Sequence, residues 1–284
     1  MAHDRKIGLR RRFGDVALAL ALIVGAGLLS YPSISDLWNR SRSSKAVSAY
    51  TEAVDGLRKQ EKQEMLDAAA SYNSDLVSDP GRFVRKPEGG REYQDLLNVN
   101  GNGMMGYVVI PSIGVELPIQ HGVSADTLQV AAGHIPGSSL PVGGDGTHCV
   151  ISAHRGLPSA KLFTDLDELN EGDLFSLHVL GEEFWYEVDQ IRTVLPEEVE
   201  GLSIEKDSDY CTLVTCTPYS INTHRLLVRG HRVEPSESME AEADAVLMRT
   251  WKEALFIMIP VLLAIFLWVV SRPRRRGDDF EDDL

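Results

Sequence analysis

Short apolar runs separated by turn-forming residues fill the chain between residues 101 and 234. They read GYVVIP, HCVISAH, LFSLHVL, EFWYEV, CTLVTC and HRLLVRG, and each is of strand length. Seven or more strands with turn signals about every 8–12 residues are typical of a closed or nearly closed β-barrel. The pattern therefore predicts a mostly β domain over residues 101–234, with one short helix at residues 159–169.

The pattern changes to a helical one before this domain. Residues 45–76 contain no proline, and their apolar residues recur at helical spacing at Val47, Tyr50, Val54 and Leu57. We predict one or two helices here, which form either a bare stalk or a layer packed on the barrel. Residues 78–90 contain two prolines and three glycines and are expected to form a loop.

Two longer apolar runs, residues 16–31 and 254–270, lie near the ends of the chain. Each is close to the ~20 residues that a helix needs to cross a bilayer. Each also has a cluster of arginines on its terminal side, so the positive-inside rule places both chain ends in the cytoplasm. The alternatives are a cleaved signal peptide for the first run and a buried core helix for the second.

The resulting domain plan has seven parts. It consists of a cytoplasmic tail (1–14), a membrane helix (15–34), an extracytoplasmic helical region with a loop (35–100), the barrel (101–234), an acidic linker (235–250), a second membrane helix (251–270) and a second cytoplasmic tail (271–284).

Composition narrows the function classes. The chain has 284 residues and a formal net charge of −14, which argues against nucleic-acid binding because phosphate contacts need clustered Lys and Arg. We find no cofactor motif and no metal-ligand spacing, and we interpret the acidic stretch 196–209 as a solvated loop instead of a calcium site. Three cysteines, Cys149, Cys211 and Cys216, fall on the oxidising side, where an odd number leaves at least one thiol unpaired.

The stretch TLVTCTPYSINTHRLLVRG, residues 212–230, carries the clearest chemistry. If its turn centres on Ser220 and Ile221, Arg225 lies directly across from Cys216. A nearby cation favours a thiolate, and a guanidinium can hold an oxyanion. Arg229 would lie roughly 13 Å further along and is expected to be a surface charge or a charge that supports the site indirectly. Cys211 has the opposite strand parity to Cys216 and cannot pair with it.

A cysteine nucleophile also needs a group that moves protons. We favour His154, because it ends the strand HCVISAH at a rim position. The other extracytoplasmic histidines are weaker candidates: His224 points to the opposite face from Arg225, His178 lies mid-strand, and the rest are His121, His134, His148 and His231.

These residues resemble the sortase family. The motif TLVTC with an arginine nine residues later, together with an upstream His-Arg-Gly, is similar to its signature. The stretches LLNVNGNGMMGYVVIPSIGVELPIQHG, GHIPGSSLPVGG, GTHCVISAHRGLPSAKLFTDLDEL and NTHRLLVRGHRV, within residues 92–234, resemble the pilus-assembling class C sortases. The resemblance implies an eight-stranded barrel, with Cys216 as nucleophile, His154 as general acid and base, and Arg225 as the residue that holds substrate and oxyanion.

The same resemblance implies a lid before the barrel. Class C sortases carry an Asp-Pro-aromatic motif that plugs the site, and the matching residues here are Asp79, Pro80 and Gly81. Asp79 could pair with Arg225 as the aspartate of the family does. Glycine occupies the aromatic position, so Phe83 is expected to fill the space instead.

The prediction is thus a monomeric, membrane-anchored cysteine transpeptidase, without a cofactor, on the outer face of a Gram-positive cell. Its expected partners are LPxTG-bearing pilin subunits with acceptor lysines. Three alternatives stay open: a housekeeping sortase that anchors proteins to the cell-wall precursor, a catalytically silent membrane-tethered scaffold, and a simple cysteine protease.

Overall fold

The structure is a computed structural model that describes residues 2–79, 81–83 and 90–234. The chain divides into two compact units, residues 1–34 with 250–284 and residues 35–249. The predicted linker, second membrane helix and C-terminal tail lie outside the described residues, as does Pro80. The first predicted span, residues 15–34, lies partly outside the residues whose side chains are described. Among the described residues, no helix is both long and apolar enough to cross a membrane.

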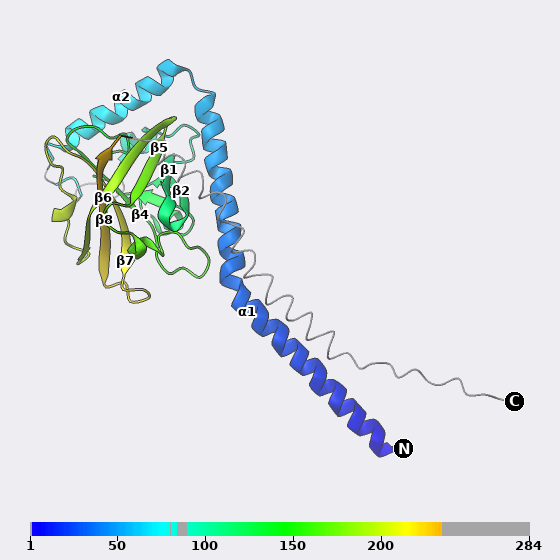
Figure 1. Ribbon diagram of the computed structural model, residues 1–284. Helices are drawn as coiled ribbons and strands as arrows, with labels where there is room; N and C mark the ends of the chain where they lie inside the picture. Colours follow the sequence, from blue (N-terminus) through cyan, green and yellow to red (C-terminus); the bar gives the residue numbers. More distant parts are fainter. Residues whose placement is uncertain (1, 80, 84–89, 235–284) are drawn as a thin grey trace. The chain divides into compact units, whose positions relative to one another are not determined.

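Eight strands close into a barrel in the order β1-β2-β3-β4-β7-β8-β6-β5, and β5 pairs with β1 (Figure 1). The β2–β3 and β4–β7 pairs are parallel and the others are antiparallel. The strands are β1 (Met104–Ile110), β2 (Val115–His121), β3 (Ala132–His134), β4 (Thr147–Ser152), β5 (Leu174–Val179), β6 (Glu182–Val194), β7 (Asp209–Thr217) and β8 (His224–Val233). The predicted eight-stranded barrel is confirmed.

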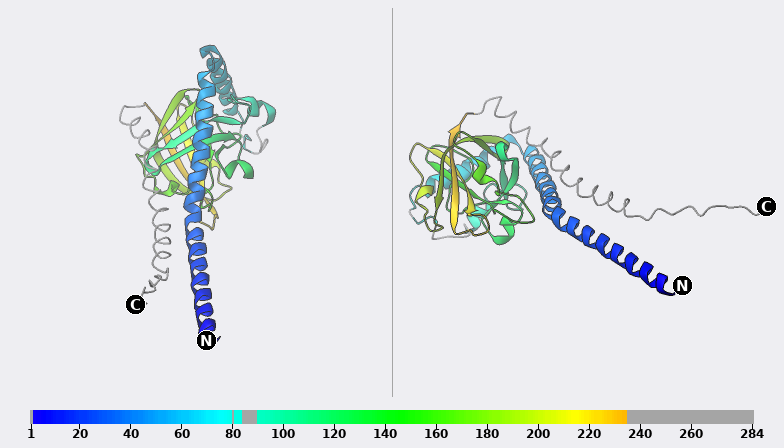
Figure 2. Two further views of the ribbon diagram at one scale, coloured as in Figure 1. Left: turned by 90° about the vertical axis from the view of Figure 1, so that its right-hand side faces the viewer. Right: turned by 60° about the horizontal axis from the view of Figure 1, so that its bottom comes forward.

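Helices precede the barrel, and within residues 35–249 they pack on it (Figure 2). They are α1 (Ala2–Asp55), α2 (Lys59–Leu76) and α3 (Gly90–Asp95), and shorter helices α4 (Ala125–Leu128), η1 (Pro111–Ile113), η2 (Leu166–Glu168) and η3 (Glu200–Leu202) lie within the barrel domain. The Tyr50 hydroxyl donates to the Met105 carbonyl at 2.8 Å and accepts from the Leu180 amide at 2.9 Å. Val47, Tyr50 and Val54 are buried in the same core as the inward strand residues. The helical region is therefore a packed layer and not a bare stalk.

The predicted helix at residues 159–169 is wrong over most of its length. Only Leu166–Glu168 form a turn of 3-10 helix, η2. Leu162 has a positive φ of 44°, which a right-handed helix does not tolerate. The Phe163 amide instead donates back to the His154 carbonyl at 3.2 Å, so this segment folds as a loop against the end of β4.

Candidate active site

The ends of β4 and β7 place His154 and Cys216 at one edge of the barrel. The two strands run in parallel with Ser152 beside Val214. The register continues beyond β4, because the Ala153 amide donates to the Val214 carbonyl at 3.1 Å and the Thr215 hydroxyl donates to the Ala153 carbonyl at 2.9 Å. His154 follows Ala153 just beyond the end of β4, and Cys216 follows Thr215 near the end of β7, so the register places the two residues next to each other.

Arg225 lies on the next strand, directly across from Cys216 in the antiparallel β7–β8 pair. This pairing is the one expected from the sequence of the hairpin. The Arg225 Nη1 donates to the carbonyls of Asn222 and His224 at 3.2 and 3.1 Å. Because a guanidinium carries five N–H donors, these bonds orient the side chain and leave donor capacity for a ligand.

The three thiols differ in accessibility. Cys149 and Cys211 are paired in register between β4 and β7 and are fully buried in the core, whereas Cys216 is only half-buried. All three are free cysteines. Cys211 therefore faces the main core, as its strand parity predicts, and Cys216 is the most exposed of the three thiols.

An apolar surface lies next to Cys216 on the outer side of the barrel wall. Val214 is two residues before Cys216 and Leu227 two residues after Arg225, so strand alternation puts them on the same face. We name this surface the outer apolar cluster; its members are Val150, Val194, Leu202, Val214 and Leu227. Its members are 0–7% exposed, so this apolar floor of the outer face is itself covered.

Phe83 covers part of this floor. Together with Ile135 it packs against the outer apolar cluster. The neighbouring Arg82 anchors the segment, because its Nη1 donates to the Gly137 carbonyl at 2.9 Å and its Nη2 to the Leu202 carbonyl at 2.7 Å. A Cβ on Gly137 would lie 2.3 Å from the Arg82 carbonyl oxygen, so the close approach requires glycine there. Burial lowers the pKa of the Arg82 guanidinium.

Asp79 has a local role in the same segment. Its Oδ1 accepts a hydrogen bond from the Gly81 amide at 3.0 Å, which closes a turn ahead of Arg82. The pairing of Asp79 with Arg225 stays a prediction. Phe83 packs against the outer apolar cluster, and its role in place of an aromatic residue at position 81 stays a prediction.

Arg155 connects the segment after His154 with the segment after Cys216. Its Nη2 forms a close ion pair with Asp167, and its Nη1 lies 3.4 Å from the Thr217 hydroxyl. Its guanidinium carbon is 6.0 Å from the centre of the Tyr219 ring. Only 10% of the side chain is exposed, and its Nε–H is buried without a partner among the described residues. This arginine thus bridges the two segments on which the predicted catalytic residues lie.

Arg229 and His178 have structural partners. Arg229 forms a two-pronged ion pair with Asp189 at 3.0 and 2.9 Å and lies over the Tyr210 ring, and hydrogen bonding to Asp189 raises its pKa. His178 stacks on Tyr107 with ring centres 4.4 Å apart. These contacts agree with the expectation that neither residue takes part in catalysis.

Two arginines of this region were not among the predicted site residues. Arg155 directly follows His154, so adjacency to a proposed catalytic residue could have pointed to it. Arg82 is different, because its partner Leu202 lies 120 positions away and no local pattern signals that contact.

Comparisons with known proteins agree with this fold. A family profile for the sortase domain matches residues 108–233. The crystal structure of sortase C1 from Streptococcus agalactiae is similar with a TM-score of 0.63 and 44% identity, covering 68% of this chain and 100% of that one. Sortase C from Streptococcus pneumoniae has a TM-score of 0.62 and 45% identity, covering 68% of this chain and 98% of that one.

A curated relative gives a shorter match. Sortase D of Bacillus subtilis (strain 168) is 30% identical over 131 residues. The aligned region covers 45% of this chain and 63% of sortase D, which is less than two thirds of that protein.

Proposed function

Because this chain belongs to the sortase family of cysteine transpeptidases, we propose that it cleaves an LPxTG-like sorting signal between Thr and Gly and transfers the acyl group to a lysine amine of a pilin subunit. The observation that carries the proposal is the juxtaposition of a half-buried cysteine, a histidine at the adjacent strand end and an arginine directly across the hairpin.

In the acylation step, Cys216 is the nucleophile. Its thiolate sulfur forms a bond with the threonine carbonyl carbon while the Thr–Gly C–N bond breaks. The departing amine is a poor leaving group, so His154 supplies its proton. The thioester that remains divides amide exchange into two easier steps.

Arg225 stabilises the charge that develops on the carbonyl oxygen. The backbone pairing of Arg225 with Cys216 supports this role, because it brings the two residues to neighbouring positions on β7 and β8. Preorganised donors of this kind are typically worth a factor of about 10²–10³ in rate. In the second step, His154 takes a proton from the incoming lysine amine, which attacks the thioester and releases the Cys216 thiolate.

The outer apolar cluster is the binding surface for the apolar residues of the sorting signal. Phe83 packs on the same side chains, so peptide and Phe83 compete for them. We propose that residues 78–83, with Asp79, Pro80 and Phe83, form a lid that must move before the signal binds. In this chain Arg82 supplies much of the anchoring of the lid, through the carbonyls of Gly137 and Leu202.

The choice of a pilin amine as acceptor is supported by the related proteins. The similar structures are of sortases of the C type, and the description of the Streptococcus pneumoniae enzyme refers to its pilin substrate specificity. A related sortase C from Clostridium perfringens was solved with the C-terminal cell wall sorting motif. We propose that this chain likewise acts on pilin substrates and binds a sorting motif. It would do so as a membrane-anchored monomer outside the cell.

The test is intact-mass spectrometry of the full chain in mild detergent with an LPxTG-type peptide. We expect an acyl adduct on the wild type and none on Cys216→Ala. A pilin domain with a lysine acceptor should remove the adduct and yield an isopeptide-linked product, whereas a peptidoglycan-type amine should not.

Each alternative gives a different result in this experiment. Preference for the cell-wall amine would indicate a housekeeping sortase, and release of free acid with lysine present would indicate a protease. If no adduct forms on the wild type or on a folded Phe83→Ala variant, the transpeptidase proposal is wrong, because a closed lid would no longer explain the silence.

A further inference from the structure

The loop that follows His154 is held from outside by α1. We name residues 155–165 the His154 loop. Its own backbone bonds close only short turns, from the Ala160 amide to the Leu157 carbonyl at 3.4 Å and from the Thr164 amide to the Lys161 carbonyl at 2.8 Å. A loop with so few internal bonds depends on its surroundings for a fixed position.

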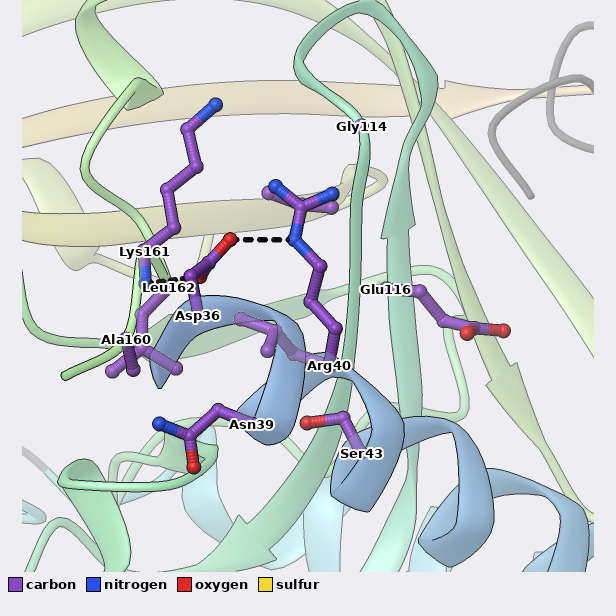
Figure 3. Close-up of a pocket in the computed structure, with 11 residues that line it drawn as sticks. Asp36, Asn39, Arg40, Ser43, Gly114, Glu116, Ala160, Lys161 and Leu162 are labelled. Carbon is purple, nitrogen blue, oxygen red and sulfur yellow. Dashed lines mark hydrogen bonds and ion pairs between the residues drawn. The ribbon is translucent and has the colours of Figure 1, made fainter. Parts of the chain in front are cut away.

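Three side chains of α1 supply that support. The Ser35 hydroxyl donates to the Ser159 carbonyl at 2.9 Å, and the Asn39 amide donates to the same oxygen at close range. The Asp36 Oδ1 accepts from the Lys161 amide at 2.8 Å. Figure 3 shows Asp36 placed between Lys161 and Arg40, whose Nε donates to the other carboxylate oxygen at 2.8 Å. The carboxylate is thereby oriented on both sides.

A short hydrogen-bond path leads from this contact to His154. The Thr164 hydroxyl donates at close range to the Lys161 carbonyl and accepts from the Gly156 amide at 3.1 Å. The Phe163 amide donates to the His154 carbonyl at 3.2 Å. The backbone on both sides of Arg155 is therefore held by Phe163 and Thr164. These two residues follow Lys161, whose amide donates to Asp36.

The cavity beside this contact does not serve as a peptide site. Its volume is about 30 Å³, enough for one or two water molecules. Its lining includes Asp36, Arg40 and Glu116, and burial raises the pKa of the Glu116 carboxyl. Only 18% of the Asp36 side chain is exposed. The region therefore connects α1 to the His154 loop and has no room for a peptide.

We propose that Asp36 is a positioning residue for His154. It ties the segment of α1 just beyond residue 34 to the loop that fixes the general acid, so the orientation of His154 depends on α1. The inference rests on the proposed role of His154 in protonating the leaving amine. Misplacing a general acid by about 1 Å can cost up to about 10²-fold in rate, so a partly freed loop should cost less than that.

The test compares two substrates with the same acyl group on the full chain. One is the sorting peptide with its Thr–Gly amide bond, and the other is a thioester of the same acyl group with an acidic thiol. The amide needs a proton on its leaving nitrogen, whereas the thiolate of the second substrate leaves without one. Both substrates must pass the same lid and bind the same outer apolar cluster. Effects on lid opening and on binding therefore cancel in the ratio of the two acylation rates.

We expect Asp36→Ala to slow acylation by the amide about tenfold and to leave the thioester rate within about twofold of the wild type. His154→Ala should show the same selective loss with a larger amplitude. Asp36→Asn keeps an acceptor oxygen for the Lys161 amide and should recover most of the amide rate. Glu52→Ala, an exposed position on the same helix, is the matched control and should behave as the wild type.

Two results would overturn the inference. Equal losses with both substrates would mean that Asp36 supports folding in general, and unchanged rates with both would mean that α1 does not influence His154. If neither the wild type nor folded Phe83→Ala forms an adduct with either substrate, the result would instead refute the proposed function.

Discussion

Alternate residues of β7 point to opposite sides of the barrel wall, and the two sides have different surroundings. Cys211 and Leu213 face inward and are completely buried in the main core, whereas Val214 and Cys216 lie on the outer side with the outer apolar cluster. The inward thiol is shielded by packing, and the outward thiol is within reach of a peptide. One strand can therefore serve as core and, in the proposed function, as active site, because alternate side chains lie on its two faces.

The neighbouring strands repeat this division. On β8, Leu226 and Val228 belong to the main core, while Arg225 and Leu227 face outward. On β4, Cys149 is inward and Val150 outward. Substitutions on the inner face should therefore change mainly stability, and those at the partly exposed Cys216 and Arg225 should change mainly activity.

The strongest test of this division is a pair of substitutions on β7. Leu213→Ala removes a fully buried side chain and should lower the free energy of unfolding by about 2–5 kcal/mol. Cys216→Ala should abolish acyl-adduct formation while it changes that free energy by no more than about 0.5 kcal/mol. Urea denaturation and intact-mass spectrometry on the same samples measure both quantities.

The division would be wrong if Cys216→Ala destabilised the protein as much as Leu213→Ala. It would also be wrong if folded Leu213→Ala, assayed well below its unfolding midpoint, lost the adduct as completely as Cys216→Ala.

His148 tests whether the outer face is equally exposed to solvent along its length. It lies on β4 beside Tyr210, with its Nδ1 2.8 Å from the Ser203 carbonyl and its Nε2 2.7 Å from the Thr212 hydroxyl. Burial lowers its pKa from 6.5 to about 4. The folded protein thus keeps this imidazole neutral where the unfolded chain protonates it. Stability should be complete above pH 6.5 and should fall as the pH drops toward 4.

The expected loss from this one group is about 2 kcal/mol at pH 5 relative to pH 7.5. His148→Gln cannot titrate and should show a smaller decrease between the two pH values, whatever its stability at pH 7.5. Urea unfolding at both pH values gives the comparison. Identical pH dependence in the two proteins would show that His148 is not buried as described and that this end of the outer face is as open as the end with Cys216.

The local patterns in the sequence were sufficient for the strands and for the hairpin that pairs Cys216 with Arg225. Strand alternation also assigned Cys211 and Cys216 to opposite faces. The turn-forming residues 218–222 left little freedom of register, so the cross-strand partner followed from counting. The apolar stripe of Val47, Tyr50 and Val54 likewise matched the buried face of α1.

The contacts that sequence patterns did not show are those between distant segments. β3 has three residues, which is too short for periodicity to reveal. The helical composition of residues 159–169 was misleading, because tertiary bonds to His154 and to α1 override local propensity there. Arg82 is anchored by two backbone carbonyl oxygens. Every residue carries such a carbonyl, so no sequence pattern marks the partners of Arg82.

The smallest expected effect concerns the covering of the outer face by Phe83. Phe83→Ala removes an aromatic ring from the outer apolar cluster and should weaken the closed position of the lid by about 1 kcal/mol. That corresponds to an increase of about fivefold in the rate at which iodoacetamide alkylates Cys216. Val77→Ala is a suitable control, because Val77 precedes the lid and is 60% exposed. An unchanged rate in Phe83→Ala would mean that Phe83 does not limit access to Cys216.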